Sequence, residues 1–565
     1  MATYDVGDHI FSPVEARRGM VASESALATR VGVDIMQAGG NAIDAAVAVG
    51  FAMAVTLPNA GNIGGGGFMI VHHAATGQDI ALDFREVAPQ AAHRDIFLDP
   101  AGNLIPGASL YTHRSSGVPG TVAGLLKALE KYGSLPRAQV LAPAIALARD
   151  GFALPPRLAE AIATEADTLR KWPASREVFF KAADGRSCLD GTCGDSINTT
   201  PLRAGDILRQ PDLAVTLERI ANAGTEGFYR GPVARGIVDE MQRHGGLITL
   251  DDLARYRAVE RPVVSGTYRG YRVVSMPPPS SGGVHLIQML NLLERFPLRQ
   301  YGAGSAQAIH VMTESMKLAY ADRAEYLGDT DFVDVPVKGL ISRAYAETLA
   351  RKIDPARARP GGELRPGNPV PYESDQTTHY SVADAAGNVA STTYTLNMNF
   401  GSGIMAEGTG VLLNNEMDDF AAKPGVPNAF GLVGGEANAV APGKRPLSSM
   451  TPVIVFRGDA PWLVTGSPGG SRIITTVLQT VVDAIDFDLN PAEAAALPRF
   501  HHQGLPDELR IERGFSPDTL RRLHEMGHRT QVKPVMGRTQ TIQREEGMLY
   551  GASDPRNPDG LTAGF

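Results

Sequence analysis

Two short runs rich in hydroxyl and β-branched side chains constrain the fold of this chain more than any other feature. The first, residues 377–384, reads Thr-Thr-His-Tyr-Ser-Val-Ala-Asp, and the second covers residues 388–397. Alternating Thr, Val, Tyr and Ser are typical of strands, and a three-residue connection that ends in Gly387 suits a hairpin. The sequence therefore predicts a β-hairpin at this position.

The register of this hairpin places two hydroxyl groups together. If Asp384 pairs with Asn388, Thr377 faces Thr395, with Cβ atoms roughly 4.5–5.5 Å apart. Thr395 is then close enough to hydrogen-bond and orient the Thr377 hydroxyl. A bulge would shift this pairing by one residue, and Thr–Thr pairs also suit sheets that have no catalytic role.

The segment before the hairpin is rich in proline and glycine. Residues 354–376 hold five prolines, at 355, 360, 366, 369 and 371. Such a segment is neither regular helix nor central strand, and we expect an exposed, mobile linker. A threonine becomes a good nucleophile only when a base beside it removes its proton. Cleavage before Thr377 would supply that base as the new α-amino group.

Upstream, the pattern is that of an α/β region. Helical patterns dominate residues 121–243, and the glycine-rich run 61–67 precedes an apolar strand, which predicts close backbone approach. The apolar stretch 42–57 carries Asp44 and is shorter than the roughly 20 residues that span a bilayer, so we expect a buried core helix.

Composition excludes some functions and leaves others open. The net charge of -8 argues against nucleic-acid binding. No signal peptide is visible, which indicates a cytoplasmic chain or one that begins after a removed leader. Two cysteines cannot form a structural zinc site. The spacing of Cys188 and Cys193 favours a small disulfide loop and an oxidising compartment, with two free surface thiols as the alternative.

Three downstream segments carry further polar groups. Residues 414–420 cluster acids, residues 444–450 hold two adjacent serines, and residues 465–472 place glycines before a helical pattern. Glycines that open a helix present free N–H groups, which suit an oxyanion or anion site. Taken singly, each signal is weak, because acid clusters are usually solvated and glycine loops are usually turns.

Together these segments resemble the γ-glutamyltranspeptidase (γ-glutamyltransferase) family of N-terminal nucleophile hydrolases, and most of all its bacterial periplasmic members. The resemblance extends from Phe11-Ser12-Pro13-Val14 to Ala552-Ser553-Asp554-Pro555-Arg556 and is densest over residues 376–472. It implies an α+β fold, a four-layer αββα sandwich. It also implies a zymogen that cleaves itself between Gln376 and Thr377 into a large subunit, residues 1–376, and a small catalytic subunit, residues 377–565.

The resemblance further implies a role for each matching residue. Thr377 is expected to be the nucleophile and Thr395 the residue that orients it. The matching substrate-binding and oxyanion residues are Arg85, Ser448 and Ser449 for the α-carboxylate, Asn397, Glu416 and Asp419 for the α-ammonium, and Gly469 and Gly470 for the oxyanion.

The implied reaction is a ping-pong transfer of a γ-glutamyl group. Donors such as glutathione or glutamine would form a γ-glutamyl ester on Thr377, which water, an amino acid or a peptide resolves. No metal or organic cofactor is expected. The expected partners are these small molecules and the two subunits, without nucleic acid or membrane insertion. The expected location is the periplasm or the outside of the cell.

The chain departs from the family pattern at three places. Phe430 stands where similar members carry a lid tyrosine, Met398 replaces a small polar residue, and the loop of Cys188 and Cys193 looks like an insertion. Two alternatives stay open: a glutaryl-cephalosporin acylase on the same scaffold, and an uncleaved homologue that acts as a binding protein.

Overall fold

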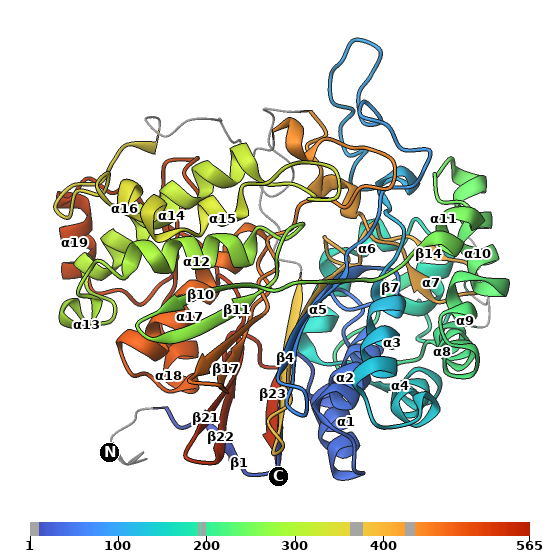
Figure 1. Ribbon diagram of the computed structural model, residues 1–565. Coiled ribbons are helices and arrows are strands. Elements are labelled where there is room, and N and C mark those ends of the chain that lie inside the picture. Colours follow the sequence, from blue (N-terminus) through green and yellow to red (C-terminus); the bar gives the residue numbers. More distant parts are fainter. Residues whose placement is uncertain (1–10, 190–192, 194–198, 362–376, 424–434) are drawn as a thin grey trace.

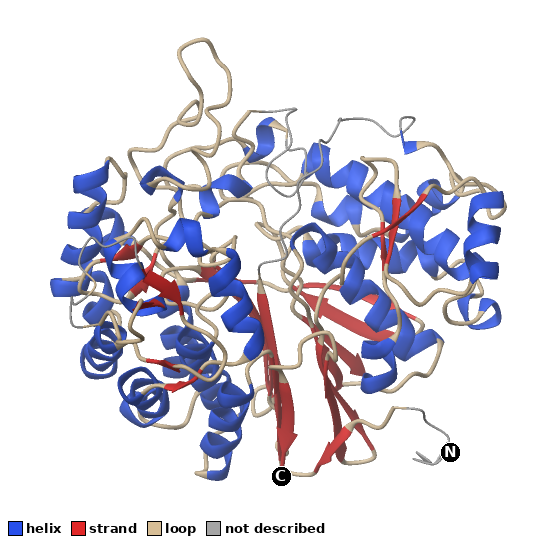
Figure 2. Cartoon of the chain, turned by 180° about the vertical axis from the view of Figure 1, so that it is seen from behind, coloured by secondary structure: helices blue, strands red, loops and turns tan. Residues whose placement is uncertain are grey.

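Two seven-stranded sheets lie face to face at the centre of the structure, and helices cover the outer face of each sheet (Figure 1). The computed structural model describes residues 11–189, 193, 199–361, 377–423 and 435–565. Figure 2 shows the same layers from behind, with the red strands between two groups of blue helices. The predicted αββα sandwich is confirmed.

Both sheets are antiparallel throughout. The first sheet has the order β1 (Val14–Ala16), β22 (Met548–Ser553), β21 (Gln540–Glu545), β17 (Ala460–Thr465), β16 (Val453–Arg457), β11 (Tyr271–Ser275) and β10 (Val264–Tyr268). The second has the order β23 (Leu561–Gly564), β2 (Gly19–Ser23), β12 (Thr378–Asp384), β13 (Val389–Thr395), β3 (Gly66–His73), β4 (Gln78–Phe84) and β9 (Val259–Arg261).

The helices divide between the two outer layers in chain order. Against the second sheet lie α1 (Ala26–Gln37), α2 (Ala42–Thr56), α3 (Thr121–Tyr132), α4 (Arg137–Asp150), α5 (Pro156–Thr164), α6 (Ala166–Leu169), α7 (Pro173–Phe179), α8 (Pro211–Ala223), α9 (Glu226–Tyr229), α10 (Gly231–His244) and α11 (Leu250–Arg255). On the side of the first sheet lie α12 (Gly282–Leu293), α13 (Leu298–Tyr301), α14 (Ala306–Tyr326), α15 (Val337–Leu340), α16 (Arg343–Ala350), α17 (Ile473–Asp486), α18 (Pro491–Ala496) and α19 (Pro517–Glu525).

Short elements complete the loops. The small strands are β5 (Phe152–Ala153), β6 (Phe180–Ala182), β7 (Thr199–Pro201), β8 (Ile207–Leu208), β14 (Met405–Ala406), β15 (Val411–Leu412), β18 (Phe500–His501), β19 (Leu509–Ile511) and β20 (Thr530–Val532). The 3-10 turns are η2 (His113–Ser115), η4 (Glu416–Asp419), η5 (Glu436–Asn438) and η6 (Gly470–Arg472).

The predicted hairpin is β12 and β13, at the centre of the second sheet. Its register pairs Thr378 with Tyr394 and Ala383 with Val389. Both strands are slightly shorter than predicted, and Thr377 lies directly before β12. Extending this register by one residue places Thr377 opposite Thr395, without a bulge.

Two local features fix this register. Gly387 has φ +93° in the connection, which only glycine adopts without strain. The Asn388 amide donates to Asp384 across the turn, at 2.8 Å from side chain to side chain.

Next to β13, a Cβ on Gly65 would lie 2.0 Å from the Thr395 carbonyl oxygen. The predicted close backbone approach of the glycine run is therefore confirmed.

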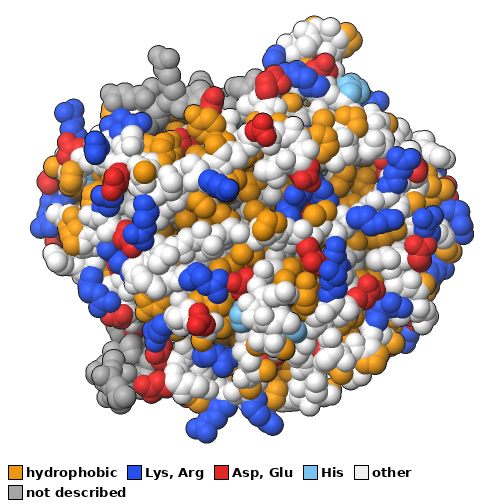
Figure 3. Space-filling view, in the orientation of Figure 1, with side chains coloured by type: hydrophobic (Ala, Val, Ile, Leu, Met, Phe, Trp, Pro, Cys, Tyr) orange, Lys and Arg blue, Asp and Glu red, His pale blue; other side chains and the backbone are white. Residues whose placement is uncertain are grey.

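The predicted core helix and the predicted disulfide are both present in the structure. Every residue of α2 is buried, so the apolar stretch is a core helix. None of the helices among the described residues combines the length and apolarity that a membrane crossing requires. A disulfide joins Cys188 and Cys193. In the face shown in Figure 3, basic and acidic side chains are interspersed rather than gathered into a basic patch.

Candidate active site

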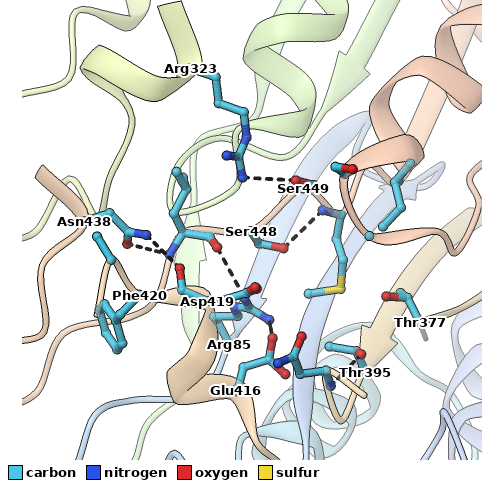
Figure 4. A pocket seen from close by; sticks show the side chains of 17 residues that line it. Arg85, Arg323, Thr377, Thr395, Glu416, Asp419, Phe420, Asn438, Ser448 and Ser449 are labelled. Carbon is cyan, nitrogen blue, oxygen red and sulfur yellow. Dashed lines mark hydrogen bonds and ion pairs between the residues drawn. The ribbon is translucent and has the colours of Figure 1, made fainter. Parts of the chain in front are cut away.

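A pocket opens where the hairpin begins and gathers side chains from both halves of the chain (Figure 4). Nine of the ten residues predicted to catalyse or bind substrate line it: Arg85, Thr377, Thr395, Asn397, Glu416, Asp419, Ser448, Ser449 and Gly470. The tenth, Gly469, directly precedes Gly470. The cavity volume of the pocket is about 30 Å³.

The hydroxyl groups of Thr377 and Thr395 lie on one side of the pocket in Figure 4. Thr377 is 5% exposed. The backbone N–H of Asn397 donates to Thr395 Oγ1 at 2.8 Å, which fixes that hydroxyl at the end of β13. Asn397 makes this contact in a left-handed conformation with φ +76°, which asparagine tolerates better than most residues.

Arg85 forms the charged floor of the pocket. It follows β4, is fully buried, and forms ion pairs through Nη1 with Glu416 and through Nη2 with Asp419, both on η4. Glu86 Oε2 lies 3.7 Å from Nη1. Nε donates to the Pro446 carbonyl at 3.3 Å. One guanidinium therefore stands among three acidic side chains.

Burial and the neighbouring charges shift the pKa values of Arg85 and of the acids around it in opposite directions. Burial lowers the pKa of Arg85, but the carboxylates of Glu416, Asp419 and Glu86 outweigh it, so that pKa lies above its ordinary value. Burial raises the pKa of Glu416 well above its ordinary value, although Arg85 lowers it. Burial likewise raises the pKa of Glu86 to about 7. Burial therefore makes ionisation of Glu416 and Glu86 more costly than in water, and the charge of Arg85 offsets part of that cost.

Two buried acceptor atoms in the pocket have no hydrogen-bond partner among the described residues. They are Asn397 Oδ1 and Glu416 Oε2. An orphaned buried acceptor costs about 1–3 kcal/mol. A ligand that supplies N–H donors at this end of the pocket would recover that cost.

The serine loop and Arg323 form the opposite wall. Arg323, on α14, donates to Ser449 Oγ at 3.0 Å and to Ser281 Oγ at 2.8 Å. Ser448 Oγ accepts from the Met450 N–H at 3.1 Å. Burial lowers the pKa of Arg323 from its ordinary value. This wall therefore offers a second buried guanidinium whose side-chain contacts are hydroxyls rather than carboxylates.

Gly469 and Gly470 lie just before the N-terminus of α17. They have φ +135° and +53°, and Gly470 opens η6, which leads into that helix. Backbone N–H groups at the start of a helix favour negative charge beside them. The sequence predicted donors at this position, and the structure places Gly470 on the pocket lining.

His379 belongs to the same motif as Thr377 but is not a base for it. Its ring contacts Thr393 Oγ1 at 2.8 Å and Ser381 Oγ at 3.1 Å. Burial lowers its pKa to about 3, so the imidazole is neutral. A Cβ on Gly466 would lie 2.3 Å from this ring, which explains the glycine there.

Two predicted residues have no described position, and three residues that line the pocket were not predicted. Gln376 and Phe430, predicted at the cleavage site and in the lid, lie outside the described residues. Arg323, Asn438 and Phe420 line the pocket but were not predicted. Nothing in the sequence around Arg323 marks it, because its place depends on how α14 packs against the serine loop.

Comparison with known proteins gives a consistent result. The family model described as Gamma-glutamyltranspeptidase matches residues 28–564. A "Glutathione hydrolase proenzyme" from Escherichia coli (strain K12) is 56% identical over 565 residues, covering 100% of this chain and 94% of that protein.

Two solved structures are similar to this fold. The cephalosporin acylase from Bacillus halodurans has a TM-score of 0.84 at 30% identity, covering 100% of this chain and 99% of that one. The Helicobacter pylori gamma-glutamyltranspeptidase has a TM-score of 0.56 at 45% identity, covering 60% of this chain and 93% of that one.

Proposed function

The chain belongs to the γ-glutamyltranspeptidase family, and on this basis we propose that it is a self-processing γ-glutamyltransferase with glutathione hydrolase activity. The donors are γ-glutamyl amides such as glutathione and glutamine. The group passes to water or to an amino acid or peptide. The identity to the Escherichia coli glutathione hydrolase proenzyme, at 56% over the full chain, supports this assignment.

Maturation creates the catalytic group. Cleavage between Gln376 and Thr377 yields a large subunit, residues 1–376, and a small subunit, residues 377–565. Each subunit contributes strands to both central sheets, so the pieces stay together as a heterodimer. Cleavage gives Thr377 a new α-amino group, and α-amino groups in general have a pKa near 7.7–8.0, which suits a base at neutral pH.

The proposed chemistry has two half-reactions. The α-amino group takes the proton of the Thr377 hydroxyl, and Oγ1 attacks the γ-carbonyl carbon. Backbone N–H groups of Gly469 and Gly470 stabilise the oxyanion, and the amine leaves with a proton. Water or an acceptor amine then attacks the ester and releases Thr377. Thr395, held by the Asn397 N–H, orients the nucleophile.

The arrangement of charges in the pocket carries the substrate assignment. The α-carboxylate binds between Arg85 and the hydroxyls of Ser448 and Ser449. The α-ammonium binds Glu416 and Asp419. Asn397 Oδ1, which lacks a partner among the described residues, accepts a further hydrogen bond from it. The site is thus complementary to a free amino-acid head.

A glutaryl-cephalosporin acylase is the second candidate, favoured by the likeness to the Bacillus halodurans acylase. A glutaryl group has no α-ammonium and would bring a negative charge towards Glu416 and Asp419 with nothing to offset them. It therefore gains less from this pocket than a γ-glutamyl group. A purified enzyme that prefers glutaryl amides would contradict our substrate assignment.

The Cys188–Cys193 disulfide supports a location in the periplasm or outside the cell, since disulfides persist in oxidising compartments.

Gel electrophoresis and product analysis test the proposal together. Wild-type protein should give two bands and release glutamate from glutathione, with transfer products when an amino acid is added. Thr377→Ala should remain one inactive band of full length, and Thr377→Ser should process and react more slowly. Persistence of the full-length band in the wild type, or cleavage after residue 376 in Thr377→Ala, would refute self-processing by this hydroxyl.

A further inference from the structure

Three side chains of metal-binding type meet on the helical layer outside the active site. His113 lies on η2, and Glu240 and His244 lie one turn apart on α10. One ligand atom from each lies within 4.8 Å of the other two. In Figure 1, α10 is on the outer side of the layer that covers the second sheet.

The Glu240–His244 distance matches that of a coordination shell, and the shorter Glu240–His113 distance is a hydrogen bond that a bound ion would replace. Glu240 Oε1 lies 2.9 Å from His113 Nε2 and 3.5 Å from His244 Nε2. Ligand atoms at 2.0–2.2 Å from a tetrahedral zinc ion are about 3.3–3.6 Å apart. The imidazole rings are nearly parallel, with centroids 4.7 Å apart and planes at 17°. Both Nε2 atoms therefore face one carboxylate oxygen.

We propose that His113, Glu240 and His244 form a binding site for a divalent transition-metal ion, with Zn²⁺ as the best-suited ion. Two imidazoles and one carboxylate match the ligand preference of zinc, and a water would complete four-coordination. The His113 and Glu240 side chains are 3% and 7% exposed, whereas His244 is 44% exposed. The site is thus prearranged on its inner side and open to solvent on its outer side.

Neighbouring groups hold these ligands in place. Arg243 Nη2 donates to the other carboxylate oxygen, Glu240 Oε2, at 2.8 Å, which leaves Oε1 directed at the imidazoles. Trp172 packs edge-on against both rings, with centroid distances of 5.0 Å to His113 and 5.5 Å to His244. Such outer contacts orient metal ligands and strengthen binding.

A second cluster of the same residue types lacks these properties. His310, Glu314 and His528 are all buried. His310 Nδ1 bonds His528 Nε2 at 2.7 Å, and its Nε2 bonds the Asp354 carbonyl at 2.7 Å. Both ring nitrogens of His310 are thus bonded, and no member of this cluster is exposed, whereas His244 in the first cluster is. The second cluster therefore serves as an internal comparison.

The position of the site indicates a stabilising role rather than a part in the reaction. Ser109 Oγ, just before η2, donates to Asp418 Oδ1 at 2.6 Å. The Asn415 amide donates to the Leu110 carbonyl at 3.0 Å. A metal that joins His113 to α10 would therefore brace the segment that supports η4, the turn that carries Glu416.

Tryptophan fluorescence gives a direct readout. The chain has only two tryptophans, Trp172 and Trp462. In a Trp462→Phe background, Co²⁺ bound beside Trp172 should quench its emission and be displaced by Zn²⁺. Processed, chelator-treated enzyme is titrated with each metal, and the melting temperature is measured with and without Zn²⁺. His244→Ala removes the exposed ligand. His93→Ala, which removes an exposed histidine outside the cluster, is the control.

We expect one Zn²⁺ per chain with micromolar affinity, quenching by Co²⁺, and a higher melting temperature with Zn²⁺. His244→Ala should weaken binding by at least about tenfold and abolish the shift in melting temperature, and His93→Ala should change neither. Absence of saturable binding at micromolar metal would overturn the proposal. Equal binding by His244→Ala and the wild type would overturn it too, because the ion would then lie at another site.

Discussion

Replacement of Arg85 by methionine tests whether this residue is a structural counterion as well as a substrate ligand. Its guanidinium is buried with Glu416, Asp419 and Glu86 around it. Methionine keeps an unbranched apolar side chain, although a shorter one, and has no charge and no donors. The variant therefore leaves three acidic groups together in a buried site, and the Pro446 carbonyl loses its donor.

The expected loss of stability follows from these contacts. Removal of one partner from a buried ion pair costs about 3–5 kcal/mol. In the variant, loss of the Arg85 charge raises the pKa values of Glu416 and Glu86 further above those of the unfolded chain. Carboxyl groups with raised folded-state pKa values stabilise at low pH and lose that contribution as pH rises. The variant should therefore be destabilised more at about pH 8 than at about pH 5.

Thermal denaturation and glutathione hydrolysis separate the two roles of Arg85. The kcat/KM of Arg85→Met should fall by about 100-fold or more, since a charge-assisted contact to the substrate is lost. A triple variant, Arg85→Met/Glu416→Gln/Asp419→Asn, should regain most of the melting temperature but none of the activity. A wild-type melting temperature in Arg85→Met, or a triple variant as unstable as the single one, would refute the counterion argument.

Two further predictions concern neighbouring groups. Thr395→Val keeps the shape but removes the acceptor of the Asn397 N–H, so kcat should fall by about tenfold or more while Thr395→Ser stays near wild type; equal activity of the two variants would contradict the orienting role. Glu86 has a folded-state pKa of about 7 against an ordinary 4.5, so its contribution to stability is lost as pH rises from about 4.5 to 7. Glu86→Gln should therefore gain in melting temperature relative to wild type from about pH 5 to about pH 8, and a pH-independent difference would be the contrary result.

The hairpin was predictable because its information is local. Gly387 and the Asp384–Asn388 pair set the turn, and the turn sets the register of every later pair. The extents of β12 and β13 were less predictable, because strands end where neighbours stop pairing. The neighbours of the hairpin, β2 and β3, lie more than 300 residues upstream.

The pocket was predictable only as a set of residues, through resemblance to a family. Nothing in the sequence indicated that Arg85 would pair with Glu416 and Asp419, because these residues are more than 330 positions apart. Arg323 was missed for the same reason. It lines the pocket because it donates to Ser449, and that contact depends on the packing of α14. Contacts of this kind are set by tertiary structure, which residue patterns do not encode locally.

The pairing of Arg85 with Glu416 and Asp419 also bears on how substrate binds. In our proposal, Arg85 binds the α-carboxylate while these two acids bind the α-ammonium, yet in the structure Arg85 and the two acids bind one another. Substrate entry is thus an exchange of ion pairs. A ligand with only a carboxylate pairs with Arg85 and leaves the two acids without a counter-ion. A ligand with only an ammonium pairs with the acids and leaves Arg85 without a counter-ion. A zwitterionic head satisfies both sides at once, so each of its charges makes binding of the other more favourable.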